Sequence, residues 1–208
     1  MSQTATEPQN NTSRKVKALL AGGLVLGVGA AVTLAAWTDQ EWAEGIFGTG
    51  TFNIQSSVDG TTFDDHEAEG EAATLVFDLP VSENMSPGDT VAAPFFMQLD
   101  ADTTYDAEVE LTAANSATEN ENYANLTYGI TEVSSADECT AEATGTPIVS
   151  AGTALDATGD PASMQLTAGA EGEAGAPLTL CFQVTADDGL TEDTTTNATW
   201  QFTGTSVE

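Results

Sequence analysis

The chain has 208 residues, of which 33 are Asp or Glu and only 3 are Lys or Arg, so its formal net charge at pH 7 is −30. All three basic residues, Arg14, Lys15 and Lys17, lie close to the N-terminus. Because so much negative charge repels phosphate backbones and anionic lipid, it excludes nucleic-acid binding, whereas it suits high salt and divalent cations.

The N-terminal segment has the three regions of a secretory signal. A basic region precedes an uncharged apolar stretch, residues 18–36, and small residues lie before a polar boundary. Cleavage between Ala35 and Ala36 leaves Thr33 and Ala35 at the two positions that require small residues. We therefore expect a signal peptide at 1–35 and a secreted protein, located at the cell surface or in an extracellular matrix. If the stretch is not cut, its 19 residues are just long enough to serve as a membrane anchor.

An apolar arm follows the expected cleavage site. It contains Trp37, Asp39, Trp42, Ile46 and Phe47, and glycines interrupt it. A large apolar side chain costs about 1.5–3 kcal/mol to leave in water. We therefore expect the arm, residues 36–50, to be buried either in its own domain or in a neighbouring subunit.

The remaining sequence predicts a single all-β domain within residues 36–208. Short runs of alternating apolar and polar residues are separated by turns rich in Gly, Asp and Asn, which is typical of an antiparallel β-sandwich. Apart from 39–45, no stretch sustains a helical period. Because Pro94 lacks an amide donor, its strand should be an edge strand or contain a bulge. We expect an acidic loop at 58–71 and strands at 74–79, 91–99, 107–111, 126–130, 147–149, 163–166, 178–184 and 198–202.

The two cysteines, Cys139 and Cys181, both lie in the expected mature chain. An even number in an oxidising compartment favours one disulfide, and two free buried thiols are the alternative. Cys181 is out of phase with the apolar residues Leu180, Phe182 and Val184 of its strand. The disulfide should therefore attach a covering loop to the outer face of that strand and leave the core unaffected.

Candidate catalytic and metal-binding residues are few. His66 is the only histidine, so neither an H-E-x-x-H motif nor a histidine-rich zinc site can form. No G-x-S-x-G nucleophile motif occurs either. We expect no enzymatic activity, no catalytic residue and no cofactor. The acidic clusters at 59–71, 100–102 and 187–188 lack EF-hand spacing, so we expect at most weak Ca²⁺ binding.

An ordered set of motifs resembles the TasA/camelysin-type family. Residues 35–39 (Ala-Ala-Trp-Thr-Asp) are similar to its boundary for a SipW-type signal peptidase. Residues 47–54 (Phe-Gly-Thr-Gly-Thr-Phe-Asn-Ile) are similar to its first strand, although Phe52 and Ile54 replace the usual leucines. Residues 87–89 (Pro-Gly-Asp) resemble a turn that opens a later strand, and Trp200 and Phe202 lie in the closing strand.

The resemblance implies a jelly-roll topology and a biofilm-matrix or pilus-like filament. In such a filament each subunit donates its N-terminal arm as a strand to the next, which makes a head-to-tail homopolymer. Two alternatives remain. One is an anchored or soluble extracellular binding module that does not polymerise and contacts the membrane only through an uncleaved signal. The other is a camelysin-like peptidase, against which the missing zinc motif counts.

Overall fold

The computed structural model describes residues 12–13, 15–20, 50–77, 82, 84–116, 120 and 122–207. The chain divides into two compact units, Met1–Phe47 and Gly48–Glu208. In the first unit the described residues are helical and exposed. None of the helices described in the structure is long and apolar enough to cross a bilayer. The expected cleavage site, the arm residues 36–49 and the helical turn at 39–45 all lie outside the described residues.

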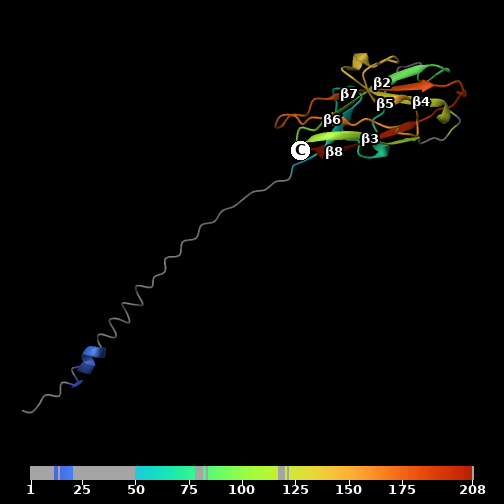
Figure 1. Ribbon diagram of the computed structural model, residues 1–208. Coiled ribbons are helices and arrows are strands. Elements are labelled where there is room, and N and C mark those ends of the chain that lie inside the picture. Colours follow the sequence, from blue (N-terminus) through green and yellow to red (C-terminus); the bar gives the residue numbers. More distant parts are fainter. Residues whose placement is uncertain are drawn as a thin grey trace, which may run out of the picture. The chain divides into compact units, whose positions relative to one another are not determined.

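The second unit confirms the prediction of an all-β antiparallel sandwich (Figure 1). A five-stranded sheet has the order β1-β2-β7-β4-β5, and a three-stranded sheet has the order β6-β3-β8. Short 3-10 turns, η1 (Glu69–Glu71), η3 (Tyr123–Asn125) and η4 (Ala136–Glu138), lie in the loops. The strands are β1 (Ile54–Ser57), β2 (Thr90–Leu99), β3 (Asp106–Ser116), β4 (Leu126–Val133), β5 (Thr146–Ala154), β6 (Met164–Leu166), β7 (Leu178–Ala186) and β8 (Ala198–Val207).

The core lies between the two sheets and follows the alternation of the sequence. On β3, Ala107, Val109 and Leu111 are buried, whereas Glu110 between them is exposed. Strand β7 lies at the centre of the larger sheet, and Leu180, Cys181 and Phe182 in succession are buried. Both faces of β7 are covered at this point, because Leu180 and Phe182 belong to the main core and Cys181 packs in a separate cluster under the loop that carries Cys139.

Aromatic side chains of β8 connect the two sheets. The Trp200 ring lies 5.0 Å from that of Phe182 and 5.4 Å from that of Tyr128, between ring centroids. Phe202 stacks on Phe95 at 5.9 Å. Such pairs contribute about 0.5–1.5 kcal/mol beyond the apolar area that they bury. Trp200 and Phe202 therefore pack against the core, although both remain partly exposed.

Two sequence predictions need correction. The strand expected at 74–79 is wrong for residues 74–77, which pair with no strand in the described part of the chain, and 78–79 lie outside that part. Pro94 lies in β2, which is not an edge strand of its sheet. However, β1 pairs only with Phe96–Leu99 of β2, so among the described residues β2 has no ladder partner before Phe96 on that side. The missing amide of Pro94 therefore leaves no ladder position unfilled, and no bulge is needed there.

The Pro-Gly-Asp motif forms the turn that the sequence predicts. The Asp89 amide donates to the Ser86 carbonyl at 2.9 Å, and the Ser86 amide donates back to the Asp89 carboxylate at 2.8 Å. Gly88 has a φ of +88°, which a residue with a Cβ rarely adopts. Strand β2 begins at the next residue, Thr90. Of the motif at 47–54, in contrast, only Ile54 lies in a strand among the described residues.

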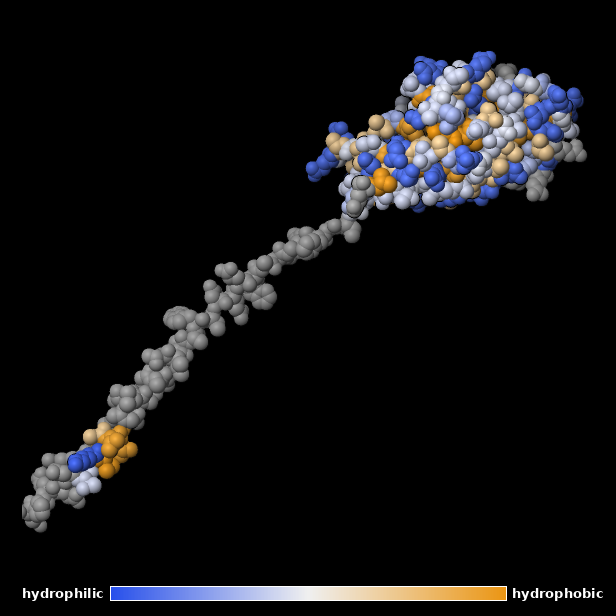
Figure 2. Space-filling model, viewed as in Figure 1, coloured by the Kyte–Doolittle hydropathy of each residue, from blue (hydrophilic) through white to orange (hydrophobic). Residues whose placement is uncertain are grey.

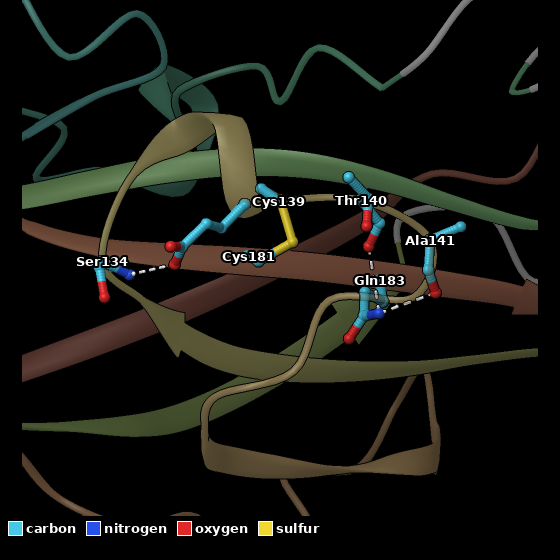
Figure 3. The surroundings of a disulfide bond; sticks show 7 residues. Ser134, Cys139, Thr140, Ala141, Cys181 and Gln183 are labelled. Atoms are coloured by element: carbon cyan, nitrogen blue, oxygen red, sulfur yellow. Dashed lines mark hydrogen bonds between the residues drawn. A yellow bond between two sulfur atoms is a disulfide. The ribbon is translucent and has the colours of Figure 1, made fainter.

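The predicted disulfide between Cys139 and Cys181 is present, with the two Cα atoms 5.1 Å apart. It attaches the loop after β4 to the outer face of β7 (Figure 3). The side-chain amide of Gln183, also on β7, donates to the backbone carbonyls of Thr140 and Ala141 in the same loop. Cys181 packs in a small apolar cluster of its own, separate from the main core. The predicted position of the disulfide outside the main core is therefore confirmed.

The sheet order is that of a jelly roll with one strand displaced. In an eight-stranded jelly roll the first strand lies beside the last, and the other neighbours are β2-β7-β4-β5 and β8-β3-β6. Those other pairings are all present here, but β1 pairs with β2 instead. Within the described part of the chain, β8 therefore has a ladder partner on its β3 side alone.

Candidate functional site

The candidate site is the outer edge of β8, which is the position where a jelly roll has its first strand. β8 is ten residues long, Ala198–Val207, and contains no charged residue and no proline. The neighbouring strand β3, by comparison, carries Asp106, Glu108 and Glu110. Soluble proteins usually guard a sheet edge with charges, prolines, bulges or short strands, because an open edge can pair with another chain.

The other sheet edges are guarded by their geometry. β1 has four residues and β6 has three, so each offers a short ladder. β5 contains Pro147, Gly152 has a φ of +84°, and the register against β4 shifts at two points. β8 has no such irregularity, since the extra residue in its pairing with β3 lies on β3. Among the described strands, β8 is thus the long, regular edge that carries no protection.

The surface beside this edge is apolar at both ends of β8. Near its end, Ile54 and Phe52 approach Gly204 so closely that a Cβ there would overlap the Ile54 side chain. Phe52 remains 39% exposed. Near its start, Trp200 and Phe202 are only partly covered. We call the apolar surface formed by Phe52, Ile54, Trp200 and Phe202 the apolar floor. Peptides that add a strand to a sheet use an open edge beside such a surface, because the backbone ladder supplies affinity and every second side chain of the added strand packs on the apolar surface. Figure 2 shows that hydrophilic residues and smaller apolar patches alternate over the face of the domain in view.

The polar groups of Trp200 and Tyr128 differ in how they are satisfied. Tyr128 donates its hydroxyl to the Ala157 carbonyl at 2.7 Å, and burial raises the pKa of Tyr128 to about 12. The indole N–H of Trp200 is buried but has no acceptor in hydrogen-bonding geometry among the described residues. The Trp200 indole lowers the pKa of Tyr128, which only partly opposes the rise caused by burial.

Both described ends of the sandwich chain meet at the end of β8. Thr51 forms a parallel bridge with Thr103, just before β3 begins, and the first residue of β3 pairs with Val207. Gly50 lies against Tyr105 in the same place. The segment that precedes Gly50, which holds the expected arm, therefore joins the sandwich where β8 ends. The start of β8 lies at the opposite end of the strand.

The acidic loop at 58–71 is exposed, as predicted, and is held by local hydrogen bonds. The Asp59 carboxylate accepts the amides of Thr61 at 2.7 Å and Thr62 at 2.8 Å, and the Ser57 hydroxyl at 2.9 Å. The Thr62 amide, then the Thr61 amide and the Ser57 hydroxyl, hold the pKa of Asp59 well below its ordinary value. This carboxylate therefore organises a turn and is already occupied by donors.

His66 makes a structural contact in the same loop. Its Nδ1 lies 2.7 Å from the Glu71 carbonyl, to which it donates when it carries the proton. Both cysteines are joined in the disulfide, so neither provides a thiol nucleophile. Within the described ranges, no three His, Cys, Asp or Glu side chains gather closely enough to hold a metal ion. The predicted weak Ca²⁺ binding stays a prediction.

Comparison with protein-family models finds no match, and comparison with curated proteins finds none either. The resemblance to TasA/camelysin-type proteins therefore rests on the motifs of the sequence and is used below as part of a proposal.

Sequence reasoning did not find the open edge of β8. It expected a strand at 198–202, whereas β8 continues to Val207. The available signal was the uncharged run 194–207 in a very acidic chain. That run predicts a strand, but whether a strand is central or at an edge depends on partners far away in the sequence.

Proposed function

We propose that the mature protein is the subunit of an extracellular filament in which the N-terminal arm of one subunit pairs with β8 of the next. The observation that carries the proposal is the long, uncharged, regular edge of β8, at the position where a jelly roll has its first strand. The arm residues Trp37, Trp42, Ile46 and Phe47 supply the apolar side chains for the floor beneath that edge.

The direction of pairing decides between a filament and a closed dimer. In a jelly roll the first and last strands are antiparallel, so an arm that takes that position runs from the end of β8 toward its start. The donor's Gly50 then faces the start of β8 on the acceptor. Every subunit has the same orientation in this contact, which is head-to-tail and does not close, so it propagates as a filament. Parallel pairing would bring two Gly50 ends together and allow a closed exchange of arms.

The length of the arm prevents it from making the same contact within its own subunit. Ten residues of β8 span about 33 Å, and an arm paired antiparallel over residues 36–45 covers the same length. It would then have to return from residue 45 to Gly50, at the end of β8, and these five steps along an extended chain reach only about 17 Å. A second copy of the chain is therefore the partner that satisfies antiparallel pairing along the full edge.

Charge opposes assembly and makes it dependent on ions. Only one acidic residue, Glu7, precedes Ala36, so each mature subunit carries 32 of the 33 carboxylates and no Lys or Arg. Screening limits repulsion to about 8–10 Å at physiological salt. We expect NaCl to promote filament formation, and Ca²⁺ to promote it more at equal ionic strength, because carboxylates at a junction share divalent ions.

The proposal is tested with purified mature protein, whose first residue, expected to be Ala36, is checked by intact mass. Negative-stain microscopy in high salt with Ca²⁺ should show polar filaments. Deletion of residues 36–44 should leave a folded monomer, and Trp42→Asp should assemble poorly because it places a charge on the apolar floor. A chain with the arm sequence scrambled keeps its length and charge and serves as the control, which should not assemble either. Equal assembly by the arm-deleted and intact proteins would refute the proposal.

A further inference from the structure

Residues 72–77, which we call the strap, combine two properties that rarely occur together. Ala73, Leu75 and Phe77 pack against the core, whereas Thr74 and Val76 between them face solvent, with Val76 65% exposed. This is the alternation of a half-buried strand. However, no backbone hydrogen bond joins residues 73–77 to any other described residue. The strap thus covers apolar surface without forming a ladder.

The contacts of the strap place it beside the open edge. Just before it, the Glu69 carboxylate accepts the hydroxyl of Thr199, near the start of β8. Ala73 and Thr74 line a shallow cavity of about 280 Å³ together with residues at the end of β1, among them Ser57. The chain then continues to the start of β2, the part of the larger sheet that β1 leaves unpaired. The chain therefore passes from the start of β8, at Glu69, to the end of β1, at Ala73 and Thr74, which places the strap near the free edges of both sheets.

We propose that the strap is an internal competitor for the arm: it covers the apolar surface beside the edge of β8 in the free subunit, and the incoming arm displaces it during assembly. This inference rests on the proposed function. The same apolar floor cannot be covered twice, so the two segments exclude each other. The arm prevails because it adds a backbone ladder to the apolar contact, which the strap does not provide.

Competition of this kind controls assembly without blocking it. While the strap is closed, it occupies the apolar surface beside the edge of β8, although the backbone of that edge stays unpaired within the described residues. The apparent affinity for an arm is the intrinsic affinity reduced by the fraction of subunits whose strap is open. A change that weakens the closed strap should therefore accelerate filament growth, even though it removes apolar contacts from the free subunit.

Substitutions on the two faces of the strap separate this effect from a general loss of stability. The double variant Leu75→Ser, Phe77→Ser weakens the buried face, and Val76→Ser changes the exposed face of the same segment. We expect the double variant to lower the concentration at which filaments appear by about tenfold or more, and Val76→Ser to leave it unchanged. An unchanged or raised threshold in a folded double variant would overturn the proposal.

The unsubstituted mature protein provides a second test that does not depend on whether the variant folds. Hydroxyl-radical footprinting should show Leu75 and Phe77 oxidised several-fold faster in filaments than in monomers, while amide exchange across Ala198–Val207 becomes slower. Slower amide exchange at β8 with unchanged oxidation of the strap would refute the displacement of the strap, while it would still support assembly through β8. If no filaments form and β8 exchanges as in the monomer under all conditions, the proposed function fails and the strap proposal fails with it.

Discussion

Removal of the disulfide should lower stability strongly without altering the core. The perturbation is the double substitution Cys139→Ala, Cys181→Ala. The two residues are 42 apart in sequence, and closing a loop of that length stabilises the folded state by about 4 kcal/mol in the chain-entropy model. For a domain of this size, such a loss lowers the melting temperature by roughly 8–16 °C.

Because the disulfide lies outside the main core, its removal should leave the packing of the aromatic core unchanged. Cys181 packs with Ala92 and Val133 in a cluster apart from the main core, so the aromatic contacts of Trp200 should survive the substitution. Urea unfolding at fixed salt measures the free energy, and near-UV circular dichroism monitors the aromatic core. Reduction of the parent protein with dithiothreitol provides an independent route to the same state. A loss below about 1 kcal/mol would refute the loop-closure reasoning, and a collapsed near-UV spectrum would refute the separation of the two clusters.

Three further predictions concern titration and the turn before β2. NMR titration should give Asp59 a pKa well below the ordinary carboxyl value. The loss of folding free energy caused by Asp59→Ala should be largest near neutral pH and should shrink as the pH falls through that lowered pKa, because a carboxyl group with a lowered pKa stabilises the fold only while it is ionised. Tyr128 should ionise near pH 12, so the free energy that its buried neutral hydroxyl contributes to folding is intact below pH ~10 and is lost between pH ~10 and ~12. A spectrophotometric titration in which all three tyrosines ionise near their usual pKa would contradict this. Gly88→Ala should cost about 1–2 kcal/mol in urea unfolding through its positive φ alone, since no atom lies within 4 Å of the added Cβ, and a neutral effect would show that the turn adapts.

The strap illustrates where the local pattern gave the right surface and the wrong hydrogen bonds. Its alternation correctly indicates one buried face, since Leu75 and Phe77 pack on the core. Whether an extended segment joins a ladder depends on which strand edge lies beside it. That neighbour is set by the ends of β1 and β8, which are far away in the chain, so the sequence pattern could not supply it.

The fold class, most of the strands, the Pro-Gly-Asp turn and the disulfide outside the core could all be predicted from the amino-acid sequence. These features depend on the alternation of side chains along a strand, on the residues that turns require, and on the phase of Cys181 relative to its apolar neighbours, and each of these can be seen in a short stretch of sequence. Three further features required the three-dimensional structure: β1 pairs with β2, β8 has an open edge among the described strands, and Gly50 lies at the end of β8. These are matters of partnership between distant segments, where several pairings satisfy the same alternation, and the choice depends on how the whole core packs.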